Sequence, residues 1–251
     1  MTFQRITAAI TTAVAFAGLC MAQKPKSQKE VDALMAIQNA TDADGRLAAI
    51  EALLTKFADT EFKVVVLEMA TETARMKGDA EQTIIYAERV LAADPNNIAT
   101  MSTLAKLIAE KTREFDLDKE DKLKQAEGYA KKALDMAPTA KKNNTMLTDE
   151  QWADRVKDSV SQAHEAMAAA AFVRKKNDVA IEEYKKALET APQPDPTTMI
   201  RLGIVYNADK KHDDAIAILD KVIATSDNAQ IKQVAAQEKV KAATAKAQQK
   251  K

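Results

Sequence analysis

Apolar residues recur three and four positions apart along most of the chain, which is the spacing of a buried stripe on an α-helix. The clearest case is residues 196–227, where Met199 and Tyr206 fall on one face of a first helix and Leu219 on one face of a second. The residues between the two stripes, 209–213, are polar. A connection this short predicts that the two helices lie antiparallel as a hairpin.

The same spacing predicts further helix pairs along the chain, with Gly78 suited to a helix exit and Asp94-Pro95 to a helix stop. The pairs are expected at residues 29–60, 61–97, 98–138, 148–192 and 196–227. Residues 229–251 follow as a helix with a Lys-rich, frayed end. Alanine, lysine, glutamate and leucine dominate the composition, which favours helix throughout. The sequence therefore predicts an all-α protein.

These pairs resemble the tetratricopeptide repeat, a unit of about 34 residues with the motif W-x2-L-G-x2-Y…A-x3-F…P. In the last pair the motif positions are occupied by Met199, Leu202, Gly203, Tyr206, Ala215, Leu219 and Asp227. Met199 stands in the Trp position, Leu219 in the Phe position and Asp227 in the Pro position. Gly203 and Ala215 are small, so the two helix backbones are expected to approach closely. The resemblance implies an α-α superhelix of about five hairpins with a C-terminal capping helix.

The repeat spacing is interrupted at two places. Surplus residues are expected at 113–121, as an enlarged charged turn, and at 139–147, as a polar loop. After the second, Thr148 and Gln151 have the spacing of a capping box, in which each side chain bonds the backbone N–H of the other residue. They are expected to begin a long helix that ends near Lys175.

Residues 1–22 have the three parts of a secretory signal peptide. Arg5 supplies the positive charge, residues 6–19 are apolar, and Cys20-Met21-Ala22 places small residues where cleavage after Ala22 requires them. The apolar run is too short and too rich in Thr for a stable membrane span. We therefore expect export to the periplasm or secretion.

Two alternatives stay open at this end. Cleavage after Ala17 is one, and lipidation at Cys20 is the other, although Leu19 stands where lipidation signals have a small residue. Residues 23–28 are polar and contain Pro25, which predicts a disordered lead-in.

The composition excludes several classes of function. Lys and Arg total 37 and Asp and Glu total 37, so the formal charge is zero, which argues against general nucleic-acid binding. The sequence has no Gly-rich phosphate loop, no Cys-x-x-Cys and no His-Glu-x-x-His motif. We therefore predict no catalytic residue, no metal site, no cofactor and no enzymatic activity. His164 is expected to be a packing residue, and His212 a solvated residue of a turn.

The resemblance also implies a concave groove lined by the first helix of each pair. Carried over position by position, it predicts the groove residues Glu68, Glu72, Arg75, Lys106, Glu165, Phe172, Ile200, Ile204 and Asn207. The two-carboxylate clamp of chaperone-binding members is not reproduced. A groove of this composition suits a protein or peptide partner with apolar anchors and some basic residues. The function implied is a non-enzymatic protein–protein interaction scaffold.

A structural alternative also fits the sequence. The protein could be a spacer or an envelope assembly factor whose contacts are made by the insertions at 113–121 and 139–151, or by its outer faces. Neither the partner nor the oligomeric state follows from the sequence.

Overall fold

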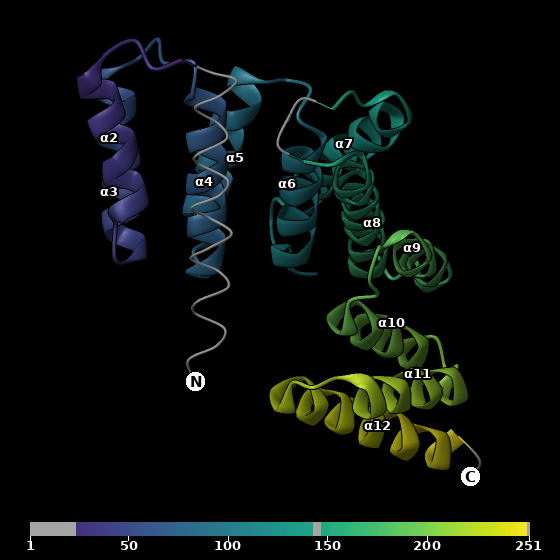
Figure 1. The fold of residues 1–251 in the computed structure, drawn as a ribbon. Helices are drawn as coiled ribbons and strands as arrows, with labels where there is room; N and C mark the ends of the chain where they lie inside the picture. Colours follow the sequence, from purple (N-terminus) through teal and green to yellow (C-terminus); the bar gives the residue numbers. More distant parts are fainter. Residues whose placement is uncertain (1–23, 143–146, 250–251) are drawn as a thin grey trace. The chain divides into compact units, whose positions relative to one another are not determined.

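The computed structural model describes residues 24–142 and 147–249, so the predicted signal peptide, 1–22, lies outside the described residues. Within them the chain is helical and contains no strand, which confirms the all-α prediction (Figure 1). The elements are α2 (Gln28–Asn39), α3 (Ala43–Lys56), α4 (Lys63–Met76), α5 (Ala80–Ala93), α6 (Ile98–Lys111), α7 (Lys119–Met136), the 3-10 turn η1 (Ala137–Thr139), α8 (Asp149–Val173), α9 (Asn177–Thr190), α10 (Pro196–Ala208), α11 (His212–Thr225) and α12 (Ala229–Gln249).

The helices belong to two compact units. The first comprises the described residues of Met1–Thr100 and Lys141–Trp152, and the second those of Met101–Ala140 and Ala153–Lys251. The division of the sequence into signal, lead-in, repeat pairs and capping helix stays a prediction.

In the first unit α2 packs on α3, α3 on α4 and α4 on α5. Their apolar stripes meet in one core, made of Leu34, Ile37, Leu47, Ile50, Leu53, Leu54, Phe62, Val66, Leu67, Ala70, Ala74, Tyr86 and Val90. The buried carboxylate of Glu30 accepts a hydrogen bond of 2.6 Å from the Thr60 hydroxyl and one of 2.5 Å from the Lys26 backbone N–H. The start of α2 is thus tied to the connection between α3 and α4.

Three hairpin turns each contain one residue in the left-handed backbone conformation. Gly78 has φ 75°, and Lys175 and Lys210 both have φ 61°. After each of them the next backbone N–H donates to a carbonyl five residues back, at 3.1, 2.9 and 2.8 Å respectively. This is the Schellman end of a helix, and it turns the chain sharply enough for the following helix to run back. The helix exit predicted at Gly78 is confirmed.

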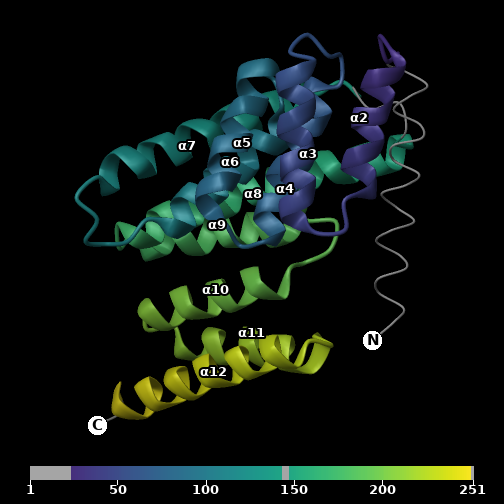
Figure 2. The ribbon, with the colours of Figure 1, turned by 90° about the vertical axis from the view of Figure 1, so that its left-hand side faces the viewer.

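In the second unit α9, α10, α11 and α12 follow one another as packed neighbours (Figures 1 and 2). The core between α8, α9 and α10 contains Ala168, Ala171, Ala180, Ile181, Tyr184, Leu202 and Val205. The core between α10, α11 and α12 contains Met199, Ile200, Leu219, Val222 and Ala235. α8 buries mostly alanine, and the Ser161 hydroxyl reaches the Ala187 carbonyl of α9 at 2.8 Å. Small side chains therefore bring these helices close together.

The close helix approach predicted from the sequence is confirmed at Gly203. A Cβ atom added there would lie 2.9 Å from Cγ of Leu219, a fully buried residue of α11. A larger residue at this position would require Leu219 or the two helices to shift.

Of the loop predicted at 139–147, residues 143–146 lie outside the described residues. The capping box after it and the turn predicted over 113–121 lie within them. The capping box is confirmed, because Thr148 N–H donates to Gln151 Oε1 at 2.9 Å and Gln151 N–H donates to Thr148 Oγ1 at 3.1 Å. The turn predicted over 113–121 is shorter than expected, because α7 already begins at Lys119. Glu120 and Asp121 lie in the first turn of α7, where carboxylates favour a helix start.

Candidate functional site

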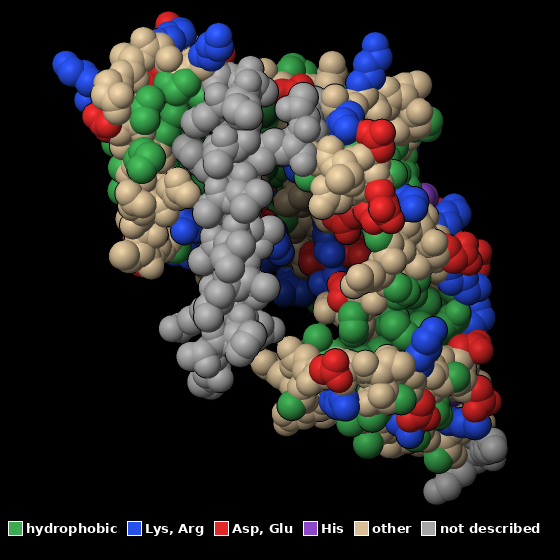
Figure 3. Space-filling model, viewed as in Figure 1, with side chains coloured by type: hydrophobic (Ala, Val, Ile, Leu, Met, Phe, Trp, Pro, Cys, Tyr) green, Lys and Arg blue, Asp and Glu red, His purple; other side chains and the backbone are tan. Residues whose placement is uncertain are grey.

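An open cavity of about 830 Å³ lies in the second unit, between the first helices of successive hairpins. It is lined by Ala109, Glu110 and Lys111 of α6, the following residues Thr112, Arg113 and Glu114, then Ala169, Phe172 and Val173 of α8, Lys175, Asn177 and Tyr184, and Arg201, Ile204, Val205 and Ala208 of α10. On the face in view, hydrophobic side chains gather around α9 and α10 with acidic and basic ones beside them (Figure 3).

The apolar part of the cavity comes from helical spacing. Ala169 and Phe172 are three apart on α8, and Ile204 and Ala208 are four apart on α10, so each pair shares one helix face. Phe172 and Ile204 are half-buried, and Ala208 is exposed. These side chains therefore leave apolar surface accessible to a ligand.

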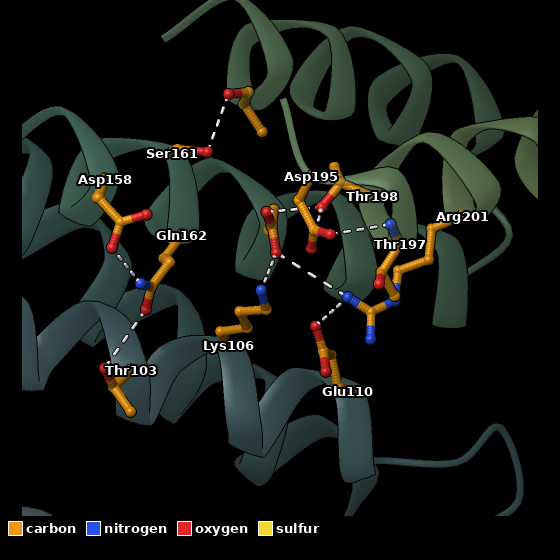
Figure 4. A network of polar contacts seen from close by, with 12 residues as sticks. Thr103, Lys106, Glu110, Asp158, Ser161, Gln162, Asp195, Thr197, Thr198 and Arg201 are labelled. Atoms are coloured by element: carbon orange, nitrogen blue, oxygen red, sulfur yellow. Dashed lines mark hydrogen bonds and ion pairs between the residues drawn. The ribbon is translucent and has the colours of Figure 1, made fainter. Parts of the chain in front are cut away.

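A network of charges lies beside this apolar surface and joins three helices (Figure 4). Glu165 of α8 is buried, accepts a hydrogen bond of 2.7 Å from the Thr198 hydroxyl and forms an ion pair with Lys106 of α6. Arg201 of α10 places Nη1 2.5 Å from Glu110 Oε1 and 3.9 Å from Glu165 Oε2. Two cations and two carboxylates therefore balance one another across α6, α8 and α10.

The balance is not complete for Glu110. Burial raises the pKa of its carboxyl group above the ordinary value, although Arg201 and Lys106 act in the opposite direction. Glu110 Oε1 and Glu165 Oε2 lie at ion-pair distances from their cations but accept no hydrogen bond of good geometry. The buried phenol of Tyr184 is close by, and burial raises its pKa as well. The network thus places charge where it is poorly hydrated, which holds the three helices in register but costs solvation free energy.

Four of the predicted groove residues lie at the cavity or in the network beside it. Phe172 and Ile204 line the cavity, while Lys106 and Glu165 belong to the charge network. The remaining predicted residue of α10 that is apolar, Ile200, packs in the core with Met199 and Leu219. Their part in binding stays a prediction.

The other predicted residues lie elsewhere. Asn207 Oδ1 is 2.7 Å from Nδ1 of His212. In the first unit Glu68 accepts a hydrogen bond of 2.8 Å from the Asn97 side chain, and Glu72 forms an ion pair with Arg75 at 2.6 Å. Binding by these residues also stays a prediction.

Arg201 is the main residue that the sequence reasoning missed. It is the one charged residue of α10, whose other residues are apolar or neutral. A single charge in such a helix indicates a buried partner, because an unpaired charge there would be costly. That signal was available in the sequence. The identity of the partner of Arg201, Glu110 on α6, follows only from the fold.

The two histidines lie outside the cavity. His164 Nδ1 is 2.7 Å from Glu183 Oε2, in keeping with a packing role. The prediction that His212 is solvated is wrong, because His212 begins α11 and is buried against Asn207. Among residues 24–142 and 147–249, no group of three or more His, Cys, Asp or Glu side chains could hold a metal ion. None of the helices in the same residues has the length and hydropathy to cross a bilayer.

Comparison with solved structures identifies the fold. A thermophilic TPR protein from Thermus thermophilus aligns with a TM-score of 0.54 and 16% identity, over 81% of this chain and 90% of that one. The fold is that of a tetratricopeptide-repeat (TPR) protein. The TPR arrangement places α6, α8 and α10, which line the cavity, as first helices of successive pairs.

Two other solved structures align at lower TM-scores. The protein MamA gives 0.42 with 20% identity over 73% of this chain and 88% of that one. A tetratricopeptide repeat protein from Parabacteroides merdae ATCC 43184 gives 0.38 with 16% identity over 92% and 93%. No family model matches the sequence. No curated protein matches it either.

Proposed function

We propose that this TPR protein is a non-enzymatic scaffold that binds a segment of another polypeptide in the cavity between α6, α8 and α10. The observation that carries the proposal is the open apolar surface of Phe172 and Ile204 beside a charge network. Repeat arrays use such concave surfaces for binding.

Binding is favoured over catalysis by the state of the polar groups. Glu165 and Glu110 are both held by cations, and neither histidine lines the cavity. A general acid or base must be able to exchange its proton with a substrate, and carboxylates engaged in this way are poorly placed for that role.

A random library of displayed 12-residue peptides tests the proposal, with the full chain as bait. The double variant Phe172→Ala, Ile204→Ala removes the apolar surface, and we expect retained peptides to bind it at least about tenfold more weakly. Because Phe172 also contacts the core, Ala208→Trp provides a second test that fills the cavity from an exposed position. Ala236→Trp, at an exposed position of α12, is its control. Peptides that bind both the double variant and Ala208→Trp as tightly as the wild-type chain would show that the cavity is not the site.

We propose in addition that the protein is exported, on the basis of residues 1–22 alone. The mass of the mature chain tests this, and we expect it to begin at Gln23. A chain that begins at Gly18 or that carries lipid on Cys20 would select one of the alternatives, and a chain with residues 1–22 intact would contradict export.

A further inference from the structure

The connection between α6 and α7, residues 112–118, presents two large apolar side chains to solvent. Phe115 is 88% exposed and Leu117 is 106% exposed, the highest values for large apolar residues in the described part of the chain. Neither side chain belongs to a described core cluster. Contiguous exposed apolar surface marks interaction sites, whereas apolar residues scattered singly are common. Phe115 and Leu117 lie two positions apart in one short connection.

The backbone of this connection is held in place by polar contacts. Arg113 N–H donates to Asp116 Oδ2 at 3.0 Å, and Asp116 N–H donates to the Arg113 carbonyl at 3.2 Å. Lys122 Nζ is 2.9 Å from Asp118 Oδ1, and Glu114 Oε1 is 2.5 Å from Lys175 Nζ. Phe115 and Leu117 are therefore carried by an ordered turn.

The turn also borders the cavity. Thr112, Arg113 and Glu114 line its rim, so Phe115 follows directly on the rim residues and Leu117 comes two positions later. A partner segment that occupies the cavity and leaves it on this side would pass over the turn.

The charges at this rim indicate the sign of the charge that a partner should carry. The cavity lining contains four cations and two carboxylates, and both carboxylates are engaged, Glu110 with Arg201 and Glu114 with Lys175. Lys111 and Arg113 form no side-chain ion pair within residues 24–142 and 147–249, and both are exposed. The cavity lining therefore carries a surplus of positive charge, while Asp116 and Asp118 of the turn are engaged by Lys122.

We propose that the turn 112–118 is a second recognition element of the cavity, and that its partner is an acidic polypeptide segment with apolar residues. Apolar side chains of the partner pack on Phe115 and Leu117, and its carboxylates lie beside Lys111 and Arg113. This inference rests on the proposed function. It differs from the sequence-based expectation of a partly basic partner, because Glu165 is already neutralised by Lys106 and Arg201.

Peptides retained from the 12-residue library provide the probes. We expect them to be enriched in Asp and Glu next to aromatic or aliphatic residues, and their binding to weaken as salt is raised. In fluorescence anisotropy titrations, Phe115→Ser with Leu117→Ser and, separately, Lys111→Glu with Arg113→Glu should each weaken binding about tenfold or more.

Matched controls change the same chemistry away from the rim. Val240→Ser alters another exposed apolar residue, on α12, and Lys124→Glu with Lys131→Glu reverses two exposed charges on α7. Both controls should bind within about twofold of the wild-type chain. Circular dichroism of every variant verifies that the helices are intact.

The outcomes separate this inference from the proposed function. If peptides lose affinity for Ala208→Trp but bind the turn and charge variants normally, or lack acidic residues, the inference is overturned and the cavity remains the site. If the peptides bind the cavity variants normally, or if the wild-type chain retains no peptide, both the inference and the proposed function fail.

Discussion

At the scale of single residues, the left-handed position found in three of the hairpin turns offers a direct test. Lys210 has φ 61°, where a side chain costs about 1–2 kcal/mol that glycine avoids. The greater conformational entropy of glycine in the unfolded chain offsets only part of this gain, so Lys210→Gly is expected to stabilise the protein by about 0.5–1 kcal/mol. Urea unfolding measures the change.

The control for this prediction is Lys221→Gly, at an exposed position inside α11. There glycine only adds flexibility, so stability is expected to fall by about 1 kcal/mol. Equal losses at both positions would contradict the turn geometry described for Lys210.

The buried carboxyl group of Glu110 predicts a pH dependence with a defined sign. Its pKa is raised in the folded protein, so above the ordinary value of 4.5 the folded state binds the proton more tightly than the unfolded state does. This group's contribution to stability therefore falls as pH rises from 4.5 through the folded pKa, by about 1.4 kcal/mol for each unit of elevation.

Glu110→Gln stays neutral and lacks this titration. The difference in unfolding free energy between variant and wild type should therefore increase in favour of the variant as pH rises through that window, and then level off. Urea unfolding at several pH values measures it. A difference that is constant with pH would show that Glu110 titrates normally in the folded chain.

At the scale of helices, two glycines provide a matched pair. Gly203 faces Leu219 across the α10–α11 contact, whereas Gly128 lies inside α7 with no atom near the added Cβ position. Gly128→Ala should stabilise the protein by about 1 kcal/mol through helix propensity. Gly203→Ala gains the same propensity but overpacks a buried contact at a cost of about 1–3 kcal/mol, so its net effect should be neutral to destabilising by about 2 kcal/mol.

Thermal unfolding of the two glycine variants measures the contrast. If Gly203→Ala raised stability as much as Gly128→Ala does, Leu219 would have to be free to move aside, and the close helix packing would be disproved.

The sequence predicts those features that depend on neighbouring residues. Thr148 and Gln151 form the capping box because both partners lie within one helical turn, and Gly203 could be recognised from its place in the repeat. The pairing of Arg201 with Glu110 could not be predicted, because it depends on how α6 and α10 are placed in three dimensions. The burial of His212 could not be predicted either, because it depends on the placement of Asn207, whose Oδ1 lies 2.7 Å from His212 Nδ1.

At the scale of the whole molecule, stability is built up from contacts between successive helices. In the second unit α9, α10, α11 and α12 each pack on the helix before or after them, and α12 also contacts α10. An array of this kind has a stability close to the sum of its hairpins and their interfaces. The last helix therefore matters more than its exposed, charged surface implies, because it has to cover the apolar side of the pair before it.

Removal of α12 tests this role. Ending the chain at Asn228 would expose the sides of Leu219 and Val222 that pack with Ala235 and Ile231. At about 25 cal/mol per Å² of apolar surface, we expect a loss on the order of 3 kcal/mol, a lower unfolding temperature and increased binding of a hydrophobic dye. Ending the chain at Lys246 removes only exposed residues among those described and should change none of these. Since α12 does not line the cavity, peptides should still bind the shorter chain at temperatures where it remains folded. Unchanged unfolding after the longer truncation would mean that α11 needs no cover, and that α12 is not the cap of the array.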